Sequence, residues 1–243
     1  MRKLVSFVCF LSLISCSQKP QQKVVPTRSI DPAATGTIRG DVRFEGVPPS
    51  PTKIPVAGFS ECANPRLEDD DVLIRDGKVQ NAFVYVKTGL EDYAFPPPEG
   101  EVVLDQVGCL YTPRVVGLQV GQTLVVKNSD PALHNVHALP KLSRSFNLAM
   151  TQGASDIRRG FTEPEVMVPI RCDVHPWMRA YAGVLPHPAF AVTGPDGRFE
   201  IKGLPPGAYT LSVWHERLGV SEQAVTLAVR EEKTVPFVIT SQR

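Results

Sequence analysis

The sequence predicts an all-β fold, and three observations support this prediction. Apolar residues alternate in short runs such as AFVYVK (82–87) and TLVVKN (123–128), which is the period of half-buried antiparallel strands. Twenty-three prolines among 243 residues disfavour long helices and suit short strands joined by turns. We find no apolar stripe at helical spacing longer than about two turns. Short strands with frequent turn residues are typical of β-sandwiches.

The first residues predict export. MRKLVSFVCFLSLISCSQ has a basic start and then an apolar run over residues 4–15, which is too short to span a bilayer but is typical of a signal peptide. The end of this run resembles the bacterial lipoprotein cleavage box, in which the cysteine is lipidated. We therefore expect a lipoprotein-type signal peptide over residues 1–16, with Cys16 as the lipid attachment site. The alternative is an ordinary signal peptide in which Cys16 is incidental.

Lipidation of Cys16 would make the chain an exported lipoprotein that faces the periplasm or the cell exterior and contacts the membrane only through its anchor. Residues 17–36 are polar and contain prolines, which predicts a flexible tether. The formal net charge of +1 gives no basic field, so nucleic acid is not an expected partner.

The outer parts of the folded region, residues 37–100 and 187–243, are expected to form a small β-sandwich. The stretch TGPDGRFEIKGLPPGAYTLSVWHERLG (193–219) has turn residues at Asp196-Gly197 and at 205–207, with alternating apolar residues between them. It resembles the carboxypeptidase regulatory-like (transthyretin-like) sandwich. Residues 36–46 resemble the opening strand of the same family. This resemblance implies one sandwich interrupted by a second one; two serial domains are the alternative.

Residues 172–178, CDVHPWM, place a thiol, an imidazole and a thioether within seven positions. Together Cys172, His175 and Met178 indicate a soft metal site, since a blue-copper centre uses two histidines and one cysteine with a long axial methionine. The second histidine must come from elsewhere in the chain. The segment NSDPALHNVHAL (128–139) offers His134 and His137.

Residues 101–186 resemble the cupredoxins. YTPRVVGLQVGQTLVVKNSD (111–130) is similar to the plastocyanin-type pattern of strand, glycine turn and strand, and the spacing within the Cys-His-Met loop is that of amicyanin. The resemblance implies a Greek-key cupredoxin sandwich that binds one copper ion, Cu(I) or Cu(II), through His134, Cys172, His175 and Met178. Asp173 departs from the family pattern, in which a small hydroxyl residue is common, and this puts the reduction potential in doubt.

Several neighbouring residues have expected roles. The resemblance implies that Asn135 ties the two ligand loops together by hydrogen bonds. His137 is expected to support the site from outside the ligand set, with direct coordination as the alternative. We expect His187 at the surface and His215 in the sandwich interior or at a domain interface. Trp177 is either a lid packed on the core or an exposed contact for a redox partner.

The cysteines then predict a disulfide. Cys9 would leave with the signal peptide, Cys16 would be lipidated and Cys172 would bind the metal. An odd thiol outside the reducing cytosol needs an explanation, so Cys62 and Cys109 are expected to pair.

The leading functional hypothesis is electron transfer between redox protein partners, with His175 at the loop edge as the electron port, as the resemblance implies. We expect no enzyme activity, because no nucleophilic triad or paired-carboxylate arrangement is evident and the carboxypeptidase-like segment resembles the regulatory sandwich, not the peptidase. The alternatives are a copper delivery or storage protein and a structural or adhesion module with a vestigial copper loop.

Overall fold

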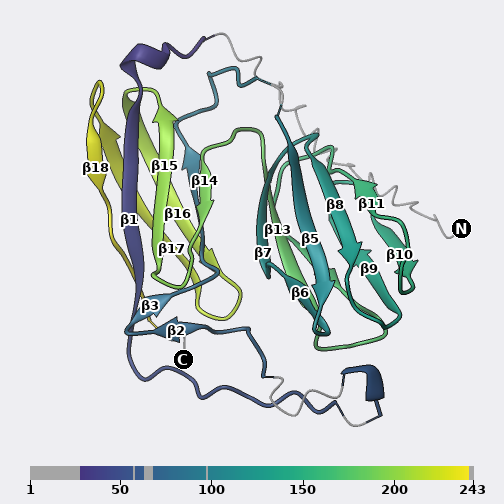
Figure 1. Cartoon of the computed structure of the whole chain (residues 1–243). Helices are drawn as coiled ribbons and strands as arrows, with labels where there is room; N and C mark the ends of the chain where they lie inside the picture. The colour runs from purple at the N-terminus through teal and green to yellow at the C-terminus, as the bar shows by residue number, and fades with distance from the viewer. Residues whose placement is uncertain (1–27, 57, 63–67, 97, 241–243) are drawn as a thin grey trace, which may run out of the picture.

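A computed structural model describes residues 28–56, 58–62, 68–96 and 98–240 (Figure 1). The all-β prediction is confirmed. In this part of the chain the only helices are two 3₁₀ turns, η1 (Pro32–Ala34) and η2 (Ser60–Cys62). The strands form two sandwiches that lie side by side in Figure 1.

The first sandwich contains the strands at both ends of the folded region. These are β1 (Gly36–Glu45), β2 (Ile74–Arg75), β3 (Lys78–Val79), β4 (Phe83–Thr88), β14 (Phe190–Val192), β15 (Arg198–Leu204), β16 (Gly207–His215), β17 (Gly219–Leu227), β18 (Glu232–Thr234) and β19 (Phe237–Thr240). One sheet has the order β15-β1-β3-β2, with β18 and β19 parallel to β1. The other has the order β14-β4-β16-β17.

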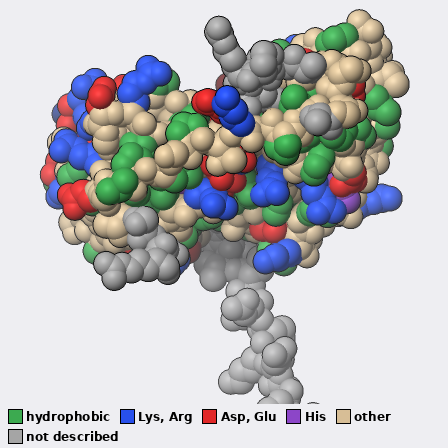
Figure 2. Space-filling view, turned by 90° about the horizontal axis from the view of Figure 1, so that it is seen from below, with side chains coloured by type: hydrophobic (Ala, Val, Ile, Leu, Met, Phe, Trp, Pro, Cys, Tyr) green, Lys and Arg blue, Asp and Glu red, His purple; other side chains and the backbone are tan. Residues whose placement is uncertain are grey.

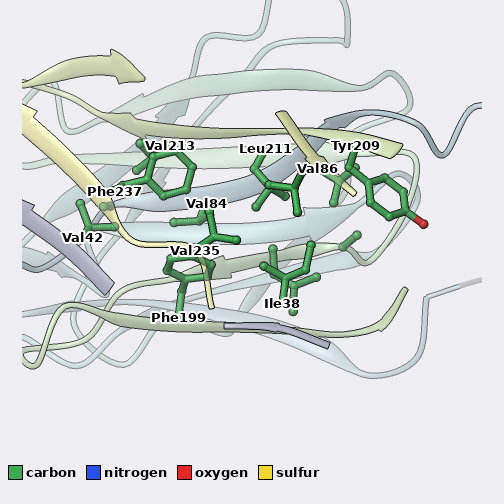
Figure 3. Packing of buried hydrophobic residues seen from close by; sticks show 14 of the residues in the cluster. Ile38, Val42, Val84, Val86, Phe199, Tyr209, Leu211, Val213, Val235 and Phe237 are labelled. Carbon is green, nitrogen blue, oxygen red and sulfur yellow. The ribbon is translucent and has the colours of Figure 1, made fainter. Parts of the chain in front are cut away.

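The core of the first sandwich follows from the alternation seen in the sequence. Ile38 and Val42 of β1 face Val84 and Val86 of β4, and all four side chains are fully buried (Figure 3). Phe237 of β19 closes the same cluster. Burial of such side chains contributes about 1.5–3 kcal/mol each, which makes this cluster the main source of stability in the sandwich.

The second sandwich contains every strand between β4 and β14. These are β5 (Glu101–Val107), β6 (Leu110–Thr112), β7 (Val115–Gln119), β8 (Thr123–Asn128), β9 (His134–Ala138), β10 (Phe146–Met150), β11 (Ile157–Arg159), β12 (Glu165–Arg171) and β13 (Arg179–Leu185). The sheet orders are β10-β9-β12-β13-β7 and β11-β8-β5-β6. The chain changes sheet repeatedly, for example from β7 to β8 and from β8 to β9, as in Greek-key sandwiches.

The chain leaves the first sandwich after β4 and returns to it at β14. These two strands pair with each other, with Phe190 opposite Tyr85. The two connections therefore begin and end on neighbouring strands, and the second sandwich is nested within the first.

One segment departs from the predicted boundaries. Residues 37–100 were expected to belong to the first sandwich, yet Ile54 and Cys62 lie in the core of the second one. Cys62 forms the expected disulfide with Cys109, with a Cα–Cα distance of 5.7 Å. The segment between β1 and β2 thus reaches across to the second sandwich and is covalently attached to it.

The two sandwiches meet at a pair of glycines. Gly117 of β7 lies opposite Gly183 of β13. A Cβ atom on Gly117 would lie 2.2 Å from the ring of Phe190, and one on Gly183 would lie 2.4 Å from the ring of Phe83. Glycine is needed at both positions because aromatic rings of the first sandwich occupy the space that side chains would fill.

A buried ionic cluster also joins the sandwiches. Arg114, next to β7, is an ion-pair partner of Asp70 and of Glu216, and Glu216 follows β16 in the first sandwich. The Arg114 side chain is 2% exposed and that of Glu216 is 7% exposed. A second hydrogen bond, from Nη2 of Arg114 to Oε2 of Glu216 (3.0 Å), makes the pair bidentate.

The expectation that His187 lies at the surface was wrong. Its side chain is buried against the ring of Phe95, with the ring centroids 5.7 Å apart. The proline-rich exit from β13 packs onto the first sandwich, so the imidazole is covered, and this burial lowers the pKa of His187 to about 4. His215 is also buried, at the end of β16 near Arg114, and burial followed by the Arg114 charge lowers its pKa to about 4.

The predicted signal peptide, the lipidation site Cys16 and most of the tether lie outside the described residues. Among the residues that are described, no helix is long and apolar enough to cross a membrane.

Candidate metal centre

The loop between β12 and β13 folds into a tight turn. Arg171 and Arg179 pair at its base. The backbone N–H of Cys172 donates to the carbonyl of Met178 (3.1 Å), and the N–H of Met178 donates to the carbonyl of His175 (2.9 Å). This turn brings Sγ of Cys172 to 3.8 Å from Nδ1 of His175.

The third donor is the first residue of β9. Nδ1 of His134 lies 2.9 Å from Nδ1 of His175. The donor atoms of His134, Cys172 and His175 all lie within 4.8 Å of one another, and all three side chains are buried. Cys172 is the one free cysteine in the described part of the chain. Three of the four expected ligands therefore converge.

Met178 and His137 occupy different environments. Met178 is fully buried in the core of the second sandwich, where the ligand loop ends. The side chain of His137 is 20% exposed and its Nδ1 lies 2.9 Å from Oδ2 of Asp173. His137 therefore lies outside the convergent set, on the opposite face of β9 from His134, as the period of a strand requires.

Each of the two candidate ligand imidazoles turns its outer nitrogen toward a carboxylate. Nε2 of His134 lies 2.8 Å from Oδ2 of Asp130, and Nε2 of His175 lies 3.4 Å from Oε1 of Glu61. Asp130 also accepts hydrogen bonds from the backbone N–H groups of Gly108 and Cys109. Carboxylates in this position fix the orientation of a ligating imidazole and raise its basicity.

The sequence interpretation missed both carboxylates. Asp130 could have been found, because it precedes His134 by four residues in the same turn. Glu61 could not, because it comes from the distant segment that the disulfide holds against the second sandwich.

Asn135 and Asp173 connect the two ligand loops. Oδ1 of Asn135 accepts from the backbone N–H of Asp173 (2.7 Å) and lies 3.3 Å from Sγ of Cys172. The carboxylate of Asp173 is bonded to Nδ2 of Asn147 and Nδ1 of His137. Asp173 therefore contacts polar groups at the surface. The sulfur of Cys172 instead receives a hydrogen bond from the backbone N–H of His175 (3.4 Å).

The electrostatics of the site favour a thiolate. Burial alone raises the pKa of Cys172, but hydrogen bonds from His134 and from backbone N–H groups outweigh it and the pKa is lowered. Burial lowers the pKa of His134, but its bonds to Cys172 and Asp130 outweigh this and raise it. Burial and then the His134 charge lower the pKa of His175.

The donor set fits copper. Two imidazoles, a thiolate and a buried thioether are the ligand types of copper electron-transfer sites. The 3.8 Å between sulfur and nitrogen is the separation of two donors that share one ion at bond lengths of about 2.3 and 2.0 Å. The 2.9 Å between the two Nδ1 atoms is a hydrogen-bond distance, so this pair must part slightly to share an ion.

Trp177 lies over the site as a lid. Its Nε1 donates to the backbone carbonyl of Cys109 (2.9 Å), and its ring packs edge-on against Phe59 at 5.0 Å. Both rings are half-buried.

The end of the molecule that carries η2 presents acidic and basic side chains in a mixed distribution (Figure 2).

Comparison with solved structures finds amicyanins. One mutant in the Cu(I) form is 23% identical over 36% of this chain and 85% of that chain, with a TM-score of 0.32. A second Cu(I) mutant is 25% identical over the same shares, also at 0.32. An oxidised mutant is 25% identical over 35% of this chain and 82% of that chain, at 0.32. No family model matches the chain, and no curated protein matches it.

Proposed function

We propose that the chain binds one copper ion in a mononuclear type 1 (blue) site and works in electron transfer. His134, Cys172, His175 and Met178 would hold the ion. The observation that carries the proposal is the convergence of one ring nitrogen from each of two imidazoles and one thiol sulfur within 4.8 Å in a buried setting. When bound, copper supplies the exchange of one electron between Cu(I) and Cu(II).

The burial of the donors favours electron transfer over catalysis. A catalytic metal site keeps an open position for water or substrate. Here the side chains of His134 and His175 are fully buried, so solvent has no direct approach to them. Asn135 and the two outer carboxylates hold the donors in place, which lowers the rearrangement that accompanies a change of oxidation state. We therefore propose a protein without enzyme activity whose partners are redox proteins.

The location is a proposal from the sequence. Export as a lipoprotein anchored through Cys16 would hold the two sandwiches near a membrane surface and within reach of redox partners there.

Absorption spectroscopy of the copper-loaded protein tests the proposed site. We expect an intense visible band from charge transfer between the Cys172 thiolate and Cu(II), and Cys172→Ser should abolish it even where some metal still binds. His137→Ala is the matched control: it removes an imidazole that lies outside the convergent set and should leave the band nearly intact. A pale site would instead support copper delivery or storage, and no binding would support a structural module with a vestigial loop. If His137→Ala bleaches the protein while His134→Ala does not, the ligand assignment is wrong.

A further inference from the structure

His175 is enclosed, although the resemblance to cupredoxins implied an electron port at this residue. Its side chain is 0% exposed. Trp177 of its own loop covers one side of the ring, at 5.3 Å between centroids. The rest of the cover comes from 58–62, a segment more than a hundred positions earlier in the chain: the ring of Phe59 lies 5.1 Å from that of His175, and Oε1 of Glu61 faces Nε2. We refer to residues 58–62 as the cap.

The cap is attached at several points. The disulfide from Cys62 to Cys109 ties it to the turn between β5 and β6. The backbone N–H of Cys62 donates to the carbonyl of Phe59 (2.9 Å), which closes the short η2 turn. Trp177 binds the carbonyl of Cys109 and packs against Phe59, so the ligand loop itself holds the other side of the cap.

We propose that the cap closes the metal centre and that Glu61 is the residue that positions His175. The carboxylate of Glu61 accepts the Nε2 proton of His175, and this leaves Nδ1 unprotonated and turned toward Nδ1 of His134 (2.9 Å) and Sγ of Cys172 (3.8 Å). The disulfide keeps the carboxylate and the Phe59 ring over the imidazole. This inference rests on the proposed function only for the role of His175 as a ligand, and its tests use the metal-free protein, so a missing copper band and an absent cap are distinguishable outcomes.

Chemical modification tests the closure. Diethyl pyrocarbonate acylates accessible imidazole nitrogens, and peptide mapping by mass spectrometry reports each histidine separately. We expect slow modification of His175 in the wild-type protein, because the reagent reaches the imidazole only when the cap opens locally, which is rare. In Phe59→Ala the ring that covers His175 is gone, so the modification rate should be about tenfold higher or more. His187, which is buried away from the cap, is the internal control and should not change.

The disulfide variant Cys62→Ser/Cys109→Ser tests the attachment by the same measurement. It should expose His175 and leave His187 protected. If His187 is exposed as well, the variant has loosened as a whole, and Phe59→Ala, which keeps the disulfide, decides. Equal His175 rates in wild type and Phe59→Ala would overturn the closure.

The tautomer of His175 tests the role of Glu61. In the metal-free protein we expect ¹⁵N NMR to show a proton on Nε2 of His175. Glu61→Leu keeps the bulk but cannot accept a hydrogen bond, so the share of the Nε2–H tautomer should fall, whereas Glu61→Gln keeps an acceptor oxygen and should restore it. A residue that only fills space would leave the tautomer unchanged in all three proteins, and that result would overturn the assignment of Glu61.

Discussion

The ion pair between Arg114 and Glu216 offers a sharp test of how the two sandwiches are joined. Arg114→Met keeps most of the side-chain length but removes the charge, and it leaves Glu216, whose side chain is 7% exposed, without its partner. Removing one member of a buried pair costs about 3–5 kcal/mol. With a urea m-value of about 2 kcal/mol/M, the unfolding midpoint should fall by roughly 1.5–2.5 M.

The loss should depend on pH in a defined direction. Burial raises the pKa of Glu216 even in the presence of Arg114, which offsets only part of the effect. Without Arg114 the folded-state pKa rises further, so the folded variant binds a proton at a pH at which the unfolded chain does not. The stability deficit of Arg114→Met should therefore be largest at neutral pH and shrink as the pH falls through the raised pKa of Glu216. The double variant Arg114→Met/Glu216→Gln should recover most of the loss at neutral pH.

Tryptophan fluorescence gives this experiment a probe in each sandwich. Trp214 of the first sandwich packs against Tyr181 of the second at 5.0 Å, and Trp177 lies at the metal centre. Urea unfolding curves of the wild type, the single variant and the double variant, recorded at several pH values, measure the free energies. A deficit below about 1 kcal/mol that does not change with pH would refute the reasoning, because it would class the pair with exposed ion pairs.

Four further predictions follow from the same structure. Met178→Leu should keep the blue colour and raise the reduction potential, since a thioether interacts more with Cu(II) than a methyl group does, and Met178→Gln should lower it; voltammetry measures both, and a colourless Met178→Leu protein would contradict a weak axial role. Replacing Cys62 and Cys109 by Ser should lower the free energy of unfolding by about 4 kcal/mol, given the separation of 47 residues, and an unchanged urea midpoint would speak against the pairing. Cys16→Ser should move the chain from the membrane to the soluble fraction, and continued retention would exclude lipidation at this position. Burial lowers the pKa of His215 to about 4, so its contribution to stability is full above the unfolded pKa of about 6.5 and is lost as the pH falls toward 4. Between pH 7 and 5 the free energy of unfolding should fall by about 2 kcal/mol for this reason. In urea titrations His215→Phe should not show this part of the pH dependence.

The parts of the fold and site that the sequence predicts are those set by local chemistry. The strands at residues 82–87 and 123–128 are predictable from their short apolar runs, although the structure buries part of both faces rather than one: Phe83 and Val84, and likewise Leu124 and Val125, are neighbours and all buried. The convergence of Cys172 and His175 is predictable because both lie in one seven-residue turn. Asn135 follows His134 directly, so its place between the ligand loops could be expected as well.

The parts that were missed depend on contacts between distant segments. Glu61 carries no local signal, since an acidic residue in a proline-rich stretch is ordinary, and only the disulfide brings it to His175. His187 is buried because Phe95 and the first sandwich cover it. Its neighbours in sequence, two prolines, suggest a surface linker. Arg114 likewise carries no local signal in the sequence, because its ion-pair partners Glu216 and Asp70 come from distant segments.

The nesting of the sandwiches gives the cap a structural reason. The two connections between β4 and β5 and between β13 and β14 lie at one end of the second sandwich, whereas η2 lies at the other end (Figure 1). At that far end the segment after β1 crosses over and bonds to Cys109, which adds a covalent link to the ion pairs that Arg114 makes there. The crossing segment contacts the ligand loop where Phe59 packs against Trp177 and His175. A tie that restrains the far end of a nested domain thus also encloses a ligand of the proposed copper site, so changes in the attachment of the cap should affect stability and access to His175 together.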